Sequence, residues 1–166
     1  EVMIEAVRKS STDITFDLFL TGVNSAYREE LRELVKGDPK ITVHDGIPYE
    51  ELLETINAYD VGIHILPPVT FNNAWALPNK LFDFVQARLG QITGPTPEMA
   101  ELVSEHGIGA VTQGYEVEDI VPILDSLTVE KVSAWKQSAD RSAQALSAEV
   151  EVPKWRDAIE KIWAKD

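Results

Sequence analysis

Two charged side chains lie close together at the start of a predicted helix, and they are the first candidates for chemistry. Lys80 and Asp83 follow an irregular, aromatic loop over residues 67–77, which itself follows an apolar segment at residues 61–66. In proteins that alternate strands and helices, ligands bind at the loop after a strand and at the first turn of the next helix, where free amides favour an anion. The long loop, the cation and the carboxylate therefore predict a binding site rather than a simple connection.

The sequence lacks the patterns of several other kinds of site. Residues 21–25 contain one glycine where a dinucleotide-binding loop needs three, and no P-loop sequence occurs, so bound NAD or FAD is not expected. The histidines at positions 44, 64 and 106 are too far apart to indicate a metal cluster by spacing, and no Gly-x-Ser-x-Gly turn marks a hydrolase. We expect structural roles for the histidines, with His44 the best exception because it closes a predicted strand at the ligand edge.

The composition limits the possible ligands and partners. With 28 acidic against 15 basic residues, the formal charge of −13 argues against binding to nucleic acid or to an anionic membrane surface. A phosphate must therefore be held locally, by amides and one or two cations. The absence of cysteine fits a reducing cytoplasm. No apolar run reaches the roughly 20 residues that span a bilayer. The sequence starts without Met inside a predicted helix, residues 1–8, so we expect a fragment of a longer protein.

Short apolar segments alternate with segments of helical periodicity. Strands are predicted at residues 17–23, 41–43, 61–66, 91–93 and 109–112. Helices are predicted at residues 1–8, after Ser25, after Pro48, and at residues 78–89, 97–106, 117–127, 129–150 and 153–164. Ser25 is expected to be an N-cap and Pro48 a first helical residue. The apolar residues at helical spacing in these two helices are expected to be buried, namely Leu31, Leu34, Val35, Leu52, Leu53 and Ile56.

This alternation predicts the fold class. Parallel strands need crossover connections, which helices provide, so the chain is expected to be an α/β protein with a parallel β-sheet in a Rossmann-like three-layer sandwich. Residues 1–166 form one predicted domain, with extra C-terminal helices over residues 128–166. In the last helix, Trp155, Ile159 and Trp163 form an apolar stripe that is expected to face a partner surface.

Five segments, in order and with matching spacing, resemble a known family. They are Leu-Thr-Gly at 20–22, Val-His-Asp-Gly-Ile-Pro at 43–48, Glu-Leu-Leu at 51–53, Tyr-Asp-Val-Gly at 59–62 and Ala-Leu-Pro-Asn-Lys-Leu-Phe-Asp-Phe at 76–84. The series is similar to the C-terminal domain of GT-B fold glycosyltransferases of family 4, also called glycosyl transferases group 1. In that family this domain binds the nucleotide-sugar donor, and a separate N-terminal domain binds the acceptor. The resemblance covers nearly the whole chain.

The resemblance implies roles for individual residues around the predicted helix. Asp83 matches the glutamate that accepts hydrogen bonds from the ribose hydroxyls, with a side chain one methylene shorter. Eight residues earlier, Trp75 replaces a glutamate that lies near the transferred sugar in many family members, so the segment around Asn79 is expected to serve instead. Lys80 is the implied catalytic cation that holds the diphosphate, with help from loop amides around Ala76.

Two turns complete the implied donor site. Gly46 and Ile47 match the turn where the family holds the edge of the base through backbone groups, and Gly22 ends the first matched segment. Residues 88–91 read Arg-Leu-Gly-Gln where the family has Gly-Leu-Pro-Val. The basic residues that the family places in or before the first strand are not recognisable. The first strand of the domain and the N-terminal acceptor domain are therefore expected to be absent from this sequence.

The sequence thus predicts the donor-binding domain of a retaining, metal-independent glycosyltransferase. It would use a nucleotide diphosphate sugar, with no separate cofactor, and transfer a hexose to a glycan or lipid. The expected partners are the nucleotide sugar and the N-terminal domain of the same chain, through which peripheral membrane contact is possible, and not nucleic acid. Two alternatives are a nucleotide-sugar epimerase of the same fold and a non-catalytic α/β interaction module. For Asp83, the alternative is a solvated helix residue; for Trp75, it is a plug at the sheet edge.

Overall fold

Five short parallel strands form the centre of the computed structural model, which describes residues 1–22 and 24–163. The strands are β1 (Phe16–Leu20), β2 (Ile41–Asp45), β3 (Val61–His64), β4 (Gly90–Thr93) and β5 (Gly109–Val111). They form two hydrogen-bonded groups, β1–β2 and β3–β4–β5. Phe16 pairs with Ile41 in the first group, and His64 pairs with Thr93 in the second. The predicted single sheet is therefore divided between β1 and β3.

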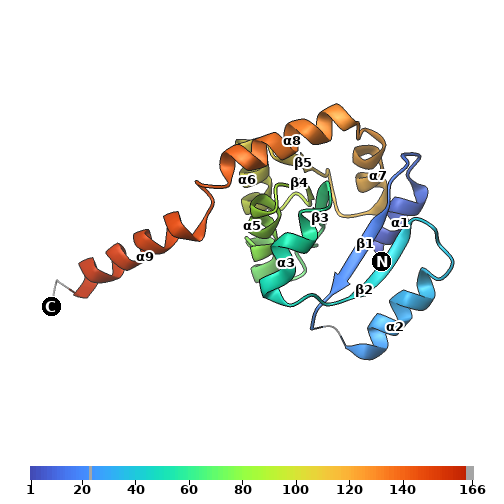
Figure 1. Ribbon diagram of the computed structural model, residues 1–166, viewed down its shortest axis with the longest axis horizontal. Helices are drawn as coiled ribbons and strands as arrows, with labels where there is room; N and C mark the ends of the chain where they lie inside the picture. The colour runs from blue at the N-terminus through green and yellow to red at the C-terminus, as the bar shows by residue number, and fades with distance from the viewer. Residues whose placement is uncertain (23, 164–166) are drawn as a thin grey trace.

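Helices separate the strands and continue after the last one (Figure 1). They are α1 (Val2–Lys9), α2 (Ser25–Leu34), α3 (Tyr49–Ile56), the short α4 (Phe71–Ala74), α5 (Asn79–Gln86), α6 (Pro97–His106), α7 (Val117–Asp125), α8 (Val129–Ser142) and α9 (Ala148–Trp163). The predicted α/β class, with parallel strands flanked by helices, is confirmed. The prediction that residues 67–77 are irregular throughout is wrong, because α4 lies within them.

Each face of the strands packs against its own set of helices. On one face, a core cluster joins α1, α2 and α7 to apolar residues of both strand groups, including Leu18, Val43 and Ile63. On the other face, Gly62 contacts the Phe84 ring of α5 so closely that an added Cβ would lie 2.5 Å from it. A second cluster joins α5, α6 and α8. The result is three layers, helix–strand–helix, as predicted.

Several local predictions need correction. The first strand ends at Leu20, and the predicted end at Val23 lies outside the described residues. Asn24, not Ser25, caps α2, because its side-chain oxygen accepts a hydrogen bond from the amide of Ala26 at 2.8 Å. Two predicted core residues are exposed: Leu34 by 45% and Leu53 by 42%. Both lie on faces of amphipathic helices that turn partly away from the strands.

The C-terminal part divides differently from the prediction. The break between the last two helices falls at residues 143–147, where the Gln86 side chain donates hydrogen bonds to the carbonyls of Ala143 and Leu146. Pro153 lies inside α9 instead of starting a helix. Helix α8 packs on the body through buried residues such as Trp135, whereas α9 projects away from it (Figure 1). The predicted end of α9 at residue 164 lies outside the described part of the chain.

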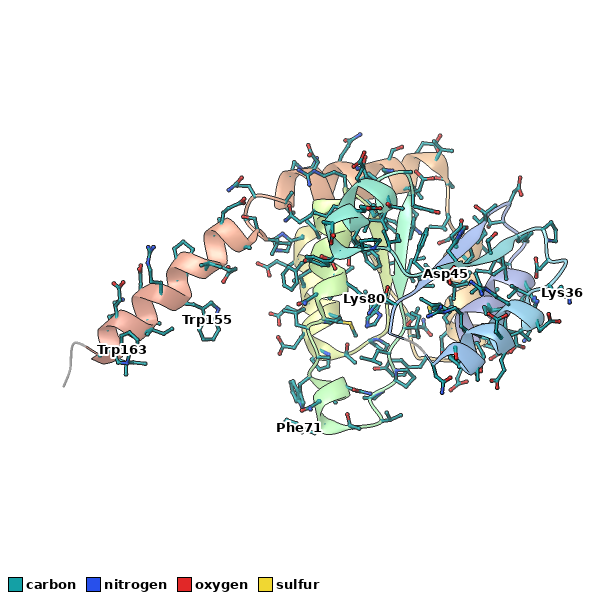
Figure 2. All side chains as sticks on the ribbon, turned by 60° about the horizontal axis from the view of Figure 1, so that its bottom comes forward. Lys36, Asp45, Phe71, Lys80, Trp155 and Trp163 are labelled. Atoms are coloured by element: carbon teal, nitrogen blue, oxygen red, sulfur yellow. The ribbon has the colours of Figure 1, made fainter. Side chains whose placement is uncertain are left out.

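The apolar stripe of α9 remains on the surface. Trp155 is 71% exposed, Ile159 44% and Trp163 75%. Both tryptophans lie on the projecting helix, far from the labelled residues of the body in Figure 2. The expectation that this stripe meets a partner surface stays a prediction.

Candidate functional site

The carboxyl ends of the strands meet at one edge of the molecule, because all the strand pairs are parallel. At this edge, the turn after β1 carries Gly22, whose φ of 70° lies in the left-handed region that favours glycine. The turn after β2 carries Gly46 and Ile47. A Cβ on Gly46 would lie 2.5 Å from the side-chain oxygen of Thr21 and 3.0 Å from its Cα. The two turns are thus in direct contact, and only glycine fits at position 46.

The same edge receives the start of α5. The preceding residue, Pro78, has extended backbone angles and precedes the first helical residue, Asn79. Leu81 and Val85 point into the core and are fully buried, and this fixes the rotation of the helix. Asn79 and Lys80 are exposed in the first turn. Within the part of the chain that the structure describes, Lys80 makes no salt bridge.

Asp83 lies one turn further along α5 and is partly buried. Burial raises the pKa of this carboxyl above its usual value, while the nearby positive charge of Lys80 and hydrogen bonding from the Tyr49 hydroxyl lower it. Tyr49 is the first residue of α3 and follows the Gly46 turn by three positions. Asp83 therefore lies near both Lys80 and the start of α3, which follows the turn after β2.

His64 adds a partly buried imidazole near Lys80. It ends β3, and burial together with the charge of Lys80 lowers its pKa. Its Nε2 atom is buried without a hydrogen-bond partner within the described residues, as is the hydroxyl oxygen of Thr93. These two residues are paired in register on neighbouring strands, so their side chains lie on the same face of the sheet. An imidazole and a hydroxyl without described hydrogen-bond partners thus lie side by side on β3 and β4, with Lys80 nearby.

The loop between β3 and α5 carries an exposed aromatic pair. The side chain of Thr70 caps α4 by accepting a hydrogen bond from the amide of Asn73 at 3.1 Å. Phe71 and Trp75, four residues apart, are 79% and 54% exposed. In Figure 2, Phe71 lies at the tip of the projecting loop and Lys80 nearer the centre of the molecule. The exposure of Trp75 argues against the alternative that it plugs the sheet edge. Ala76 is half-buried in the chain that leads to α5.

The predicted site residues therefore fall into two sets. The first set lies on elements at the carboxyl edge: Gly22, Gly46 and Ile47 in the turns after β1 and β2, and Asn79, Lys80 and Asp83 on α5. Trp75 and Ala76 lie on the adjoining loop, and no described contact ties their side chains to Lys80 or Asp83.

Sequence reasoning missed three residues and misjudged one. The carboxyl edge of the strands also includes Thr21, Tyr49 and His64. Of these, only His64 could have been recognised from the sequence, because it ends a predicted apolar strand segment. His44 was the preferred exception among the histidines. In the structure its Nε2 contacts Asp17, and its ring stacks on Phe19 with centroids 4.7 Å apart. Its side chain is therefore engaged by two residues of β1.

The described residues lack the features of two other kinds of site. No three His, Asp or Glu side chains in the described ranges are grouped as metal ligands would be. No described helix has the length and apolar character to cross a membrane. A surface groove of about 810 Å³ lies elsewhere, between β1 and β3, and is not lined by Lys80 or Asp83.

The fold and this edge define a Rossmann-like α/β domain. No protein-family model matches the chain, and no curated protein matches it in sequence. Among solved structures, it is similar to the crystal structure of WaaG, a glycosyltransferase involved in lipopolysaccharide biosynthesis, with a TM-score of 0.67 and 17% sequence identity. The match covers 95% of this chain and 42% of that one, so the chain spans less than half of the WaaG chain. At this identity the likeness shows the fold.

Proposed function

We propose that this chain is the nucleotide-sugar donor-binding domain of a retaining GT-B fold glycosyltransferase. The observation that carries the proposal is the meeting of Lys80 and Asp83 on α5 with the Gly46 turn and Tyr49 at the carboxyl edge of the strands. Ligands bind at this edge in open α/β proteins. The match to less than half of a solved glycosyltransferase chain supports a second domain in the whole protein.

Lys80 is proposed to hold the diphosphate. It is an exposed cation in the first turn of a helix, where the helix dipole disfavours a positive charge unless an anion lies nearby. A bound diphosphate supplies that anion, and the free amides at the start of α5 add hydrogen bonds. As the sugar leaves, negative charge grows on the diphosphate, so fixed donors at this place stabilise the transition state more than the ground state. Lys80 is the proposed catalytic residue in the full-length enzyme.

Asp83 is proposed to bind the ribose. Its carboxylate has two oxygens that accept hydrogen bonds, enough for the two vicinal hydroxyls of a ribose. The desolvation that raises its pKa removes competing water, so that a hydroxyl donor to this carboxylate regains what burial costs. Tyr49 links this carboxylate to the turn at Gly46 and Ile47, whose backbone groups are proposed to hold the base.

A thermal-shift titration with UDP and GDP tests this function. A ligand that binds only the native state stabilises it by about 2.7 kcal/mol at 100 times its dissociation constant, which raises Tm by several degrees for a chain of this size. Lys80→Met should reduce the shift, because the diphosphate loses its cation. Lys36→Met is the matched control, since Lys36 is an exposed lysine paired with Glu33 and lies far from Lys80 (Figure 2). A flat response to all nucleoside diphosphates at millimolar concentration would favour the interaction-module alternative.

A further inference from the structure

Three polar side-chain atoms near the carboxyl ends of β3 and β4 are buried without a hydrogen-bond partner among the described residues. They are the Nε2 atom of His64, which ends β3, and the hydroxyl oxygens of Thr93 and Thr96. Thr93 ends β4 and is fully buried, and Thr96, three residues later, is 1% exposed. Buried polar groups in proteins are nearly always hydrogen-bonded, because an unpaired group has lost its contact with water for no return. Three such atoms at one end of two neighbouring strands indicate a place for a ligand.

His64 and Thr93 face the amino end of α5. They are paired in register, so their side chains project from the same face of the strands. Two residues before Thr93 and therefore on this same face, the side chain of Gln91 donates a hydrogen bond to the carbonyl of Leu81, in the first turn of α5, at 3.0 Å. Thr93 lies one step nearer the carboxyl edge, where α5 begins. The charge of Lys80, also in the first turn, lowers the pKa of His64, in agreement with this placement.

Thr96 brings the amino end of a second helix to the same face. It is the N-cap residue of α6, yet its hydroxyl makes no capping hydrogen bond. Helices α5 and α6 share one core cluster, which includes Met99 and Val103 of α6, so both lie on the same face of the strands. The N-cap residue of α5 is Pro78, which has no side-chain oxygen to offer. The first amides of both helices thus have no side-chain acceptor within the described residues, and such helix ends favour an anion.

The chemistry of the three side chains suits an anionic oxygen. A threonine hydroxyl donates one hydrogen bond, and an imidazole with its proton on Nε2 donates another. Lys80 adds a positive charge nearby, whereas the carboxylate of Asp83 lies one turn further along α5. His64 is partly exposed and the two threonines are buried, so the place opens at His64, and rotation of this side chain admits a ligand. Once inside, an anion is shielded from water, which strengthens its hydrogen bonds.

We propose that His64, Thr93 and Thr96 form an anion pocket between the amino ends of α5 and α6, and that this pocket binds a phosphate group. The imidazole and the two hydroxyls donate hydrogen bonds to the phosphate oxygens, and Lys80 offsets the charge. The pocket is inferred from the unpartnered buried atoms. Its ligand rests on the proposed function, under which it is the distal phosphate of a nucleoside diphosphate. The pocket then makes the site selective for a nucleoside diphosphate over a monophosphate.

Isothermal titration calorimetry with UDP and UMP, and with GDP and GMP, tests this selectivity. The wild-type chain should bind the diphosphate at least about tenfold more tightly than the monophosphate, and Thr93→Val should weaken diphosphate binding at least about tenfold while leaving monophosphate binding unchanged. The Tm of Thr93→Val should stay the same or rise, because valine keeps the shape and removes an unpaired buried hydroxyl. Thr112→Val is the matched control. Its hydroxyl donates to the carbonyls of Thr93 and Gly114, so this variant should lower Tm and keep the preference for the diphosphate.

An NMR titration with inorganic pyrophosphate separates the pocket from the proposed function, because this probe has no nucleoside. Pyrophosphate should shift the ring signals of His64, which His64→Gln identifies, and leave those of His106 in place. His106 ends α6 at the opposite end from Thr96, and its Nδ1 lies 3.0 Å from the Ser142 hydroxyl. A shift at His64 without binding of any nucleoside diphosphate would support the pocket and overturn the proposed function. Unmoved His64 signals, or a Thr93→Val variant that binds nucleoside diphosphates as the wild type does, would overturn the pocket and leave the proposed function standing.

Discussion

Replacing Gly46 with alanine tests whether the two turns at the carboxyl edge form one structure. The new Cβ would lie 2.5 Å from the Thr21 hydroxyl oxygen and 3.0 Å from the Thr21 Cα. Rotation of the Thr21 side chain relieves the first contact, but the second is with the backbone, so one of the turns must shift. Overpacking of this kind costs about 1–3 kcal/mol. For a chain of this size, each kcal/mol lowers Tm by about 2–4 °C.

The direction of the Tm change in Gly46→Ala decides between the two outcomes. Glycine to alanine at a position without strain stabilises a protein by about 0.4–1 kcal/mol, because the unfolded chain loses freedom. A decrease in Tm by differential scanning calorimetry therefore requires the contact with Thr21. In the double variant Thr21→Ala and Gly46→Ala, most of the loss should remain, because the 3.0 Å contact with the backbone Cα of residue 21 is still present. If Gly46→Ala alone leaves Tm unchanged or raises it, the packing of the two turns is wrong.

Three further predictions concern the site and its support. His64 has a folded-state pKa below its ordinary 6.5, so the unfolded state binds more protons below that pH. The free energy of unfolding should therefore fall as the pH is lowered below 6.5, by up to about 1.4 kcal/mol per pH unit, and His64→Gln should reduce this pH dependence in urea denaturation. Nucleotide affinity should not change when EDTA is added. The sequence contains no Asp-x-Asp pair that could bind a cation bridging the diphosphate. A tenfold loss of affinity on chelation would contradict this prediction. Gln86→Leu should lower the free energy of unfolding by about 1–3 kcal/mol, because the carbonyls of Ala143 and Leu146 lose their hydrogen-bond donor. Urea denaturation measures this change. An unchanged midpoint would show that water replaces the Gln86 side chain as donor.

Strong local patterns made much of the fold predictable. Helix α6 has the predicted bounds, Pro97–His106, since proline favours its first turn and Gly107 ends it in the left-handed conformation. The ends of strands were less predictable. The apolar run of residues 61–66 continues past β3, because Ile65 packs on the core after the hydrogen-bonded ladder has stopped. Apolar character reports burial, whereas a strand also needs a hydrogen-bonded neighbour.

The site was predictable only where its residues are neighbours in sequence. Lys80 and Asp83 share the first two turns of one helix, so their spacing was informative. Tyr49 reaches the same carboxylate from another helix, and Thr21 contacts Gly46 across two turns. Such contacts depend on the packing of parallel strand ends, which a single sequence does not specify. The preference for His44 over His64 as a site residue failed to foresee another such contact, because Asp17 on the neighbouring strand engages the His44 side chain.

Ribose recognition by Asp83 is the central claim, and isothermal titration calorimetry with UDP and 2′-deoxy-UDP measures it most directly. Hydrogen bonds to a charged group contribute about 1.5–3 kcal/mol each, so the wild-type chain should prefer UDP. Asp83→Asn should weaken UDP binding at least about tenfold and lose most of that preference. The variant should keep or raise Tm at neutral pH, because burial disfavours the charged carboxylate in the folded state. A variant with unchanged Tm that binds both nucleotides as the wild type does would contradict the account, and Asp83 would then be only a residue of α5.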